Sequence, residues 1–115
     1  MKISNRAVAD VQVLDCSGKI TLGEGTMSIR NAIRSLLQSG AKNIVLNLAD
    51  VSSVDSAGIG ELMSAYTTVV NAGGKLMLLN LTKRIHELLA ITKLLTVFEV
   101  LDSESSIRLR FHSWE

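Results

Sequence analysis

The amino-acid sequence predicts a single α/β domain. We expect a mixed, mostly parallel β-sheet of about four to five strands, flanked by about four helices and opened by an N-terminal β-hairpin. After residue 22, short apolar runs alternate with segments whose apolar residues recur at helical spacing, which is typical of parallel strands joined by crossover helices. With 115 residues and no linker or low-complexity segment, the chain fits one domain over 1–115.

The first segments are expected to form the hairpin. Residues 7–14 and 19–22 have strand character, and the turn signal at 15–18 separates them. A helix is expected to begin within 23–26, with Thr26 or Glu24 near its cap. Its apolar stripe is formed by Ile29, Ala32, Ile33, Leu36 and Leu37, and Gly40 is placed to end it.

The central unit is a strand, a turn and a second helix. Residues 43–48 are an apolar run of strand formers. Asp55 is placed to cap the following helix by accepting from the N–H groups of its first turn. Ser56 then lies at about the first helical position, at the positive end of the helix dipole. Gly58 and Gly60 stand where better helix formers are usual, which indicates that something approaches the backbone closely.

The rest of the chain continues the alternation of strands and helices. The expected elements are the end of the second helix at 71–74, a buried parallel strand at 75–80, a third helix capped by Thr82, a short strand at 97–100, and a final helix that Asp102 or Ser103 caps and that ends near Phe111. The apolar residues Leu109, Phe111 and Trp114 could pack internally or serve a partner.

Composition argues against several classes of protein. The 12 Lys and Arg nearly balance the 11 Asp and Glu, so no nucleic-acid partner is expected. No apolar run reaches the ~18 residues that span a membrane, and residues 1–6 lack the apolar stretch of a secretory signal. The single Cys16 cannot form an internal disulfide, which fits a reducing compartment. We therefore expect a cytoplasmic protein with no membrane partner.

Three roles are open to Ser56: an accessory to the helix cap, a nucleophile, or an acceptor of a phosphate. A hydrolase nucleophile elbow would have glycine two residues before the serine, where Val54 stands. The two histidines, His86 and His112, lie on a charged helix face and in the C-terminal tail, so neither is placed as a catalytic base. No set of His, Cys, Asp and Glu has the spacing of metal ligands, and no cofactor is expected.

A phosphate fits the position of Ser56 well. It would lie over unpaired N–H groups at the helix N-terminus and would add about −1.5 to −2 charge. A charge ~4 Å from a like charge on a partner costs about 4 kcal/mol at an effective dielectric constant near 20. Phosphorylation could therefore turn partner binding off. On the residues considered so far, a purely structural cap formed by Asp55 and Ser56 stays open as the other interpretation.

The segment Asp55-Ser56-Ala57-Gly58-Ile59-Gly60 resembles the Asp-Ser-x-Gly-Leu-Gly signature of the bacterial anti-sigma factor antagonists, which belong to the STAS domain family. Ile59 stands where leucine is usual. The resemblance extends over nearly the whole chain and includes the patterns at 17–22, 43–48, 73–76 and 94–100. It implies a STAS-like fold and a protein that is not an enzyme.

The resemblance also implies a partner-switching mechanism. An anti-sigma factor that is itself a serine kinase, of the histidine-kinase-like ATPase class, would bind the unphosphorylated chain and so release a sigma factor. It would then phosphorylate Ser56, and a PP2C-type phosphatase would reset the switch. The implied partner-binding residues are Asp55, Ser56, Ala57, Gly58 and Gly60, with Ser53, Gly23, Glu24 and Thr26 beside them. The alternative is a non-switching scaffold or small-ligand-binding regulatory module; the chain is expected to be a monomer or weak dimer.

Overall fold

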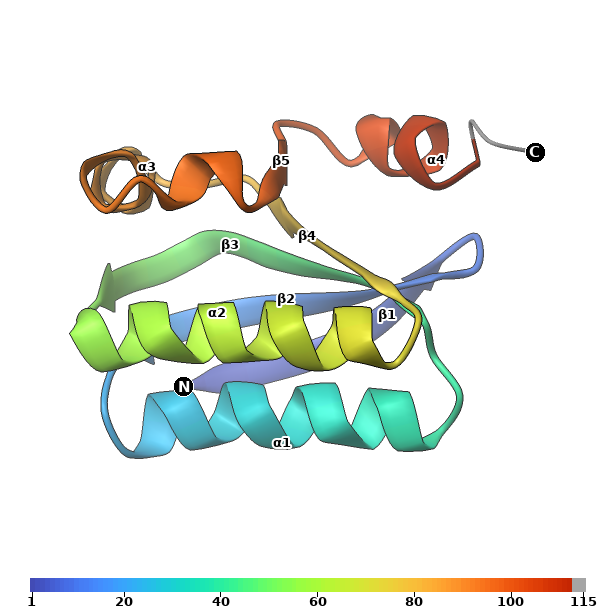
Figure 1. The fold of residues 1–115 in the computed structure, drawn as a ribbon, viewed down its shortest axis with the longest axis horizontal. Coiled ribbons are helices and arrows are strands. Elements are labelled where there is room, and N and C mark those ends of the chain that lie inside the picture. The colour runs from blue at the N-terminus through green and yellow to red at the C-terminus, as the bar shows by residue number, and fades with distance from the viewer. Residues whose placement is uncertain (113–115) are drawn as a thin grey trace.

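The computed structural model describes the backbone of residues 1–112 and the side chains of residues 1–110. Over this part of the chain it contains five strands and four α-helices, joined by short loops (Figure 1). The elements in chain order are β1 (Lys2–Val8), β2 (Val11–Ile20), α1 (Glu24–Gln38), β3 (Asn43–Val54), α2 (Ser56–Asn71), β4 (Lys75–Leu79), α3 (Lys83–Ile91), the 3-10 turn η1 (Leu94–Thr96), β5 (Glu99–Leu101) and α4 (Ser105–His112).

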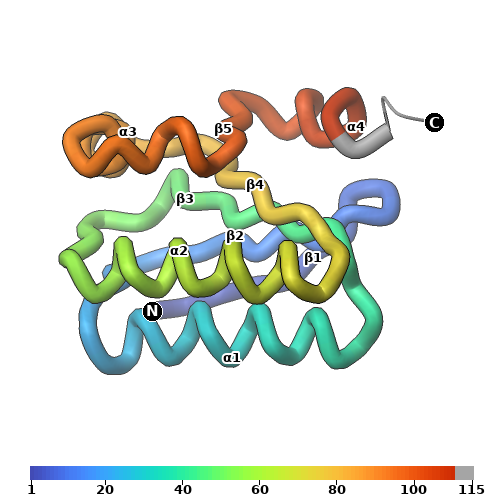
Figure 2. The backbone as a smooth tube through the Cα atoms, in the orientation of Figure 1, coloured from blue at the N-terminus to red at the C-terminus, as the bar shows by residue number. Residues whose placement is uncertain are grey.

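The five strands form one sheet in the order β1-β2-β3-β4-β5. The first pair is antiparallel and the other three pairs are parallel. Each parallel pair is joined by one crossover helix, because parallel neighbours need a long connection. The predicted mixed, mostly parallel sheet and its N-terminal hairpin are confirmed. The helices α1 and α2 lie side by side along the sheet, as the backbone trace also shows (Figure 2).

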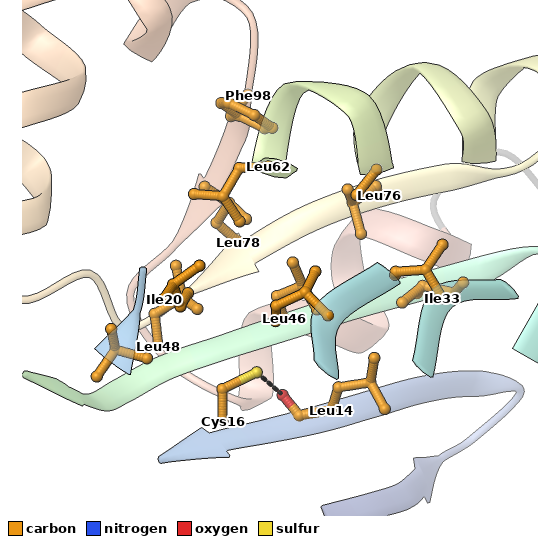
Figure 3. Close-up of a cluster of buried hydrophobic side chains, with 14 of the residues drawn as sticks. Leu14, Cys16, Ile20, Ile33, Leu46, Leu48, Leu62, Leu76, Leu78 and Phe98 are labelled. Atoms are coloured by element: carbon orange, nitrogen blue, oxygen red, sulfur yellow. Dashed lines mark hydrogen bonds between the residues drawn. The ribbon is translucent and has the colours of Figure 1, made fainter. Parts of the chain in front are cut away.

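Alternate residues of the strands form two apolar clusters, one on each face of the sheet. The larger cluster lies between the sheet and the helices that cross it (Figure 3), and it includes Leu14, Ile33, Leu46, Leu62, Leu78 and Phe98. The smaller cluster is on the opposite face, where Ile107 of α4 covers Val11, Val13, Val45, Met77, Leu79 and Leu101. Leu109 of the same helix is 72% exposed. The side chain of Phe111, and the whole of Trp114, lie outside the described residues.

The hairpin turn is not where the sequence predicts it. The chain reverses at Ala9 and Asp10, and the expected turn at 15–18 is part of β2. Asp15 and Ser17 are polar because α4 leaves that part of the opposite face uncovered. The pairing of β2 with β3 shifts register between Asp15 and Ser17, and again after Gly18, which has a φ of +118°. The turn-like residues therefore mark irregularities within a strand and not its end.

Two other predicted boundaries are wrong. β3 continues to Val54, six residues beyond the predicted end, because its second half pairs with the end of β2 and buries Val51 and Val54. β5 covers Glu99–Leu101, so it begins two residues later and ends one residue later than the predicted 97–100 strand. Val97 belongs to the preceding turn. α1 begins within 23–26 as predicted: Gly23 is its N-cap, Glu24 is its first residue, and the Thr26 hydroxyl bonds to the Gly23 backbone. The predicted cap of α3 is confirmed: Thr82 accepts from the N–H of Ile85.

A chain of polar side chains crosses the uncovered part of the opposite face. The Arg6 guanidinium donates to both oxygens of Asp15, at 2.6 and 3.2 Å, and forms an ion pair with Glu104 at 2.6 Å. The Asn47 amide donates to Asp15 at 2.8 Å. The Arg6 hydrogen bonds, with the Asn47 bond, lower the pKa of Asp15. This network links β1, β2 and β3 to the segment that precedes α4.

Within residues 1–112, none of the helices has the length and apolar character that crossing a lipid bilayer would require.

Candidate functional site

Asp55 is the residue between β3 and α2, and its carboxylate connects two loops. One oxygen, Oδ1, accepts from the N–H of Gly58 at 2.8 Å, which caps the first turn of α2 as predicted. The other oxygen, Oδ2, accepts from the N–H of Leu22 at 3.0 Å. The second bond reaches the loop that joins β2 to α1. Asp55 therefore fixes that loop against the start of α2.

The two backbone donors also set the ionisation of Asp55. The N–H of Leu22, and next the N–H of Gly58, stabilise the negative form and lower the pKa of the carboxyl below its ordinary value of 3.8. Asp55 is therefore a carboxylate throughout the neutral range. Its negative charge lies directly beside Ser56.

Ser56 is the first residue of α2, and its side chain is exposed. Its hydroxyl forms no hydrogen bond with any described residue of the chain, since Asp55 supplies the oxygen that caps the helix. The sequence left three roles open for Ser56. The structure argues against the first of them, an accessory to the helix cap, because the hydroxyl takes no part in the cap. A free hydroxyl at a helix N-terminus can accept a phosphate without losing an internal bond.

The two glycines of the motif have different environments. A Cβ on Gly58 would lie 2.0 Å from the carbonyl oxygen of Ile20, so this position must be glycine for α2 to approach the end of β2. Gly58 is buried, and the group that approaches its backbone closely, as the sequence indicates, is the Ile20 carbonyl of β2. Gly60 is exposed and a Cβ there would meet nothing within 4 Å. Ala57, directly before Gly58, is half-buried.

The same close approach recurs at the start of α1. A Cβ on Gly25 would lie 2.2 Å from the carbonyl oxygen of Lys19, the residue before Ile20. The first turns of both helices thus pack closely against consecutive carbonyl groups of β2. As a result, α1 and α2 begin at the same end of the molecule (Figure 1). We call this end, defined by Leu22, Gly23, Met27, Ser56 and Gly60, the serine end.

The predicted residues beside the motif belong to this region but differ in accessibility. Gly23 has a φ of +102°, and its N–H and carbonyl both bond to the hydroxyl of Thr26, at 3.2 and 3.1 Å. Thr26 is only 6% exposed, because its side chain packs inside the loop and bonds to Gly23. Glu24 is exposed and accepts from the Met1 amino group at 3.1 Å. Ser53 is half-buried on β3, where it pairs with Lys19 of β2.

Sequence reasoning missed three features of the serine end. Leu22, predicted as the last residue of a strand, is in the loop and is 78% exposed. Met27, in the first turn of α1, is about half exposed. Arg30 of α1 forms an ion pair at 2.7 Å with Glu61 of α2, and Glu61 is only 5% exposed. The sequence signal that could have placed Leu22 in the loop is the glycine that follows it, since glycines often mark the ends of strands.

The described residues offer no metal centre. Among residues 1–110, no group of three or more His, Cys, Asp and Glu side chains is arranged to hold a metal ion. Cys16 is buried and its thiol donates to the carbonyl of Leu14 (Figure 3). Burial, with a smaller effect of the Asp15 charge, raises the pKa of the Cys16 thiol to about 12, so it stays protonated.

Fold and site together define a small α/β domain that presents an exposed serine at the start of a helix beside the carboxyl end of a strand. The family model of the STAS domain matches residues 2–107. The chain belongs to the STAS domain family. Two of the relatives that it matches are named anti-sigma-B factor antagonist and anti-sigma F factor antagonist.

Individual comparisons agree with this assignment. The Bacillus subtilis anti-sigma-B factor antagonist is 32% identical, over 79% of this chain and 81% of that protein. A crystal structure from Thermotoga maritima, of a protein described as a candidate anti-sigma factor antagonist, superimposes with a TM-score of 0.83 at 22% identity and covers 90% of this chain and 89% of that one. The structure of the Bacillus cell fate determinant SpoIIAA in its phosphorylated form superimposes with a TM-score of 0.73 at 20% identity. It covers 96% of this chain and 99% of that one.

Proposed function

We propose that this chain is an anti-sigma factor antagonist that is switched by phosphorylation of Ser56. In the unphosphorylated state it binds an anti-sigma factor that is also a serine kinase, and a sigma factor is released. Phosphorylation ends the binding, and a PP2C-type phosphatase restores it. The chain itself works by binding and is a substrate of the kinase, not a catalyst. One observation carries the proposal: the Ser56 hydroxyl is exposed at the start of α2 and bonds to none of the described residues, while Asp55 caps the helix.

The charge of α2 explains how one phosphate could act as a switch. Glu61 is the only charged residue between Ser56 and Asn71, and it is buried against Arg30. The exposed surface of α2 is therefore uncharged before modification. A phosphate adds about −1.5 to −2 charge to it. A like charge ~4 Å away on the partner then costs about 4 kcal/mol, which is roughly a thousandfold in affinity.

The relatives support the partner class. A protein named anti-sigma-B factor antagonist is 32% identical to this chain, and another named anti-sigma F factor antagonist, from Paenibacillus polymyxa, is 22% identical. By these names, both relatives act against anti-sigma factors. The same class of partner is the proposal for this chain.

The test is intact-protein mass spectrometry after incubation with ATP and each serine kinase of the anti-sigma class from the organism that encodes this chain. We expect one added phosphate, mapped to Ser56 by peptide fragmentation. The matched control is Ser52→Ala, because Ser52 is an exposed serine four residues away whose hydroxyl already bonds to the Gly18 carbonyl. That variant should still be modified, and Ser56→Ala should not. If no kinase modifies the wild-type chain, the non-switching scaffold or ligand-binding module becomes the better hypothesis.

A further inference from the structure

Leu22 is a large apolar side chain in an unusual position. It is 78% exposed, yet its backbone N–H is held at 3.0 Å by the carboxylate of Asp55. Single exposed leucines are common on protein surfaces and need no explanation. This one differs because the loop that carries it is tied to the residue directly before Ser56. An apolar group on a fixed backbone loses less conformational entropy when a partner covers it.

The residues near Leu22 are mixed in character. Met27 is apolar, whereas Glu24 is exposed and paired with the Met1 amino group, and the Arg30 guanidinium donates to the Met27 sulfur at 3.9 Å. Met27, about half exposed, donates its backbone N–H to the carbonyl of Gly23, the residue after Leu22. Gly60 adds open space on α2. The carboxylate of Asp55 is directed at two backbone N–H groups. The serine end therefore presents two exposed apolar side chains, Leu22 and Met27, near a serine hydroxyl that bonds to none of the described residues.

We propose that Leu22 is a specificity-determining contact for the kinase that phosphorylates Ser56. This inference rests on the proposed function. A kinase must bring the terminal phosphate of ATP to the Ser56 hydroxyl, so its surface around the ATP site must cover the first turn of α2. Since Asp55 joins that turn to Leu22 through one hydrogen bond, the same surface reaches Leu22. The kinase accordingly carries an apolar pocket beside its ATP site, and Leu22 occupies it.

The test compares two exposed leucines. Leu22→Ser removes the apolar contact, and Leu109→Ser is the matched control, because Leu109 is 72% exposed on α4, the helix that covers the opposite face of the sheet. Binding is measured by titration calorimetry in a Ser56→Ala background, with the kinase that modifies Ser56 of the wild-type chain. We expect Leu22→Ser to weaken binding by about tenfold or more. Leu22→Met should bind nearly as well as leucine, and Leu109→Ser should have no effect.

A second measurement follows the phosphorylation itself. With the Ser56 hydroxyl present, kcat/KM for phosphate transfer should fall by a similar factor in Leu22→Ser and Leu22→Ala, with melting temperatures close to that of the wild type. If both variants bind and are phosphorylated like the wild type, Leu22 is not a determinant, although the phosphorylation switch stands. If Leu22→Ser changes only self-association in sedimentation, Leu22 contacts a second copy and the inference is overturned. If no kinase modifies wild-type Ser56, the proposed function and this inference fall together.

Discussion

Asp55 and Leu22 are joined by a 3.0 Å hydrogen bond from the Leu22 N–H to the Asp55 carboxylate. The two residues are 33 positions apart in the sequence. The bond lets one side chain do two things, because its other oxygen caps α2 through the N–H of Gly58. The loop before α1 and the first turn of α2 are therefore held as one unit around Ser56.

Replacing Asp55 should loosen this unit. Asp55→Ala removes both acceptors, so we expect a lower melting temperature, by a few degrees, as for other lost helix caps. Amide hydrogen exchange should rise at Leu22 and Gly58 more than in the sheet. Asp50→Ala is the control, since Asp50 is an exposed carboxylate of β3 outside the cap. Equal exchange at Leu22 in both variants would show that the bridge does not hold the loop.

The two glycines of the motif should respond to alanine with opposite signs. Gly58→Ala places a methyl group 2.0 Å from the Ile20 carbonyl oxygen, so α2 must move away from β2, at a cost of about 1–3 kcal/mol. Gly60→Ala has open space and should stabilise the helix by about 0.5–1 kcal/mol. Urea unfolding measures both. A stabilising Gly58→Ala would contradict the close packing described here.

The ion pair between α1 and α2 should contribute to stability through its buried partner. Arg30→Ala leaves the carboxylate of Glu61 buried without the guanidinium 2.7 Å away, and we expect a loss of about 1–3 kcal/mol in the free energy of unfolding. Arg34→Ala, one turn further along α1, removes an exposed arginine and should cost less than about 0.5 kcal/mol. Denaturant titration compares them. Similar losses in the two variants would mean that the pair is not a specific contact.

Acid should destabilise the domain through two carboxylates. The pKa values of Asp15 and Asp55 are both lowered in the folded chain, by Arg6 and by the Leu22 N–H respectively. The unfolded chain therefore binds these protons first as the pH falls. The stability that they contribute is fully present above the ordinary pKa of 3.8 and is lost as the pH falls through the lowered values. In Asp15→Asn, the free energy of unfolding measured in urea should fall less steeply as the pH is lowered. If the fall is as steep as in the wild type, groups other than Asp15 cause the loss of stability in acid.

The sequence predicts most of the elements and the cap of α2 because those features are local. Apolar spacing shows a helix or a buried strand directly, and Asp55 precedes the helix that it caps. The hairpin turn was misplaced because Asp15 and Ser17 imitate a turn, and only the tertiary arrangement shows that their face of the sheet is open. The bond from Leu22 to Asp55 could not be predicted, since it depends on how β2 and β3 end side by side.

Substitutions of Ser56 separate its structural and regulatory roles. The Ser56 hydroxyl forms no hydrogen bond with the described residues, so Ser56→Ala should keep the wild-type melting temperature and partner affinity and should lose the response to ATP. Ser56→Asp should also fold normally, but its added charge should weaken binding to the kinase by at least about tenfold. Calorimetric titration of each variant against the same kinase, with and without ATP, distinguishes the two effects. If both variants bind equally well and still respond to ATP, the switch lies at another residue, and the free hydroxyl of Ser56 is only a surface feature of α2.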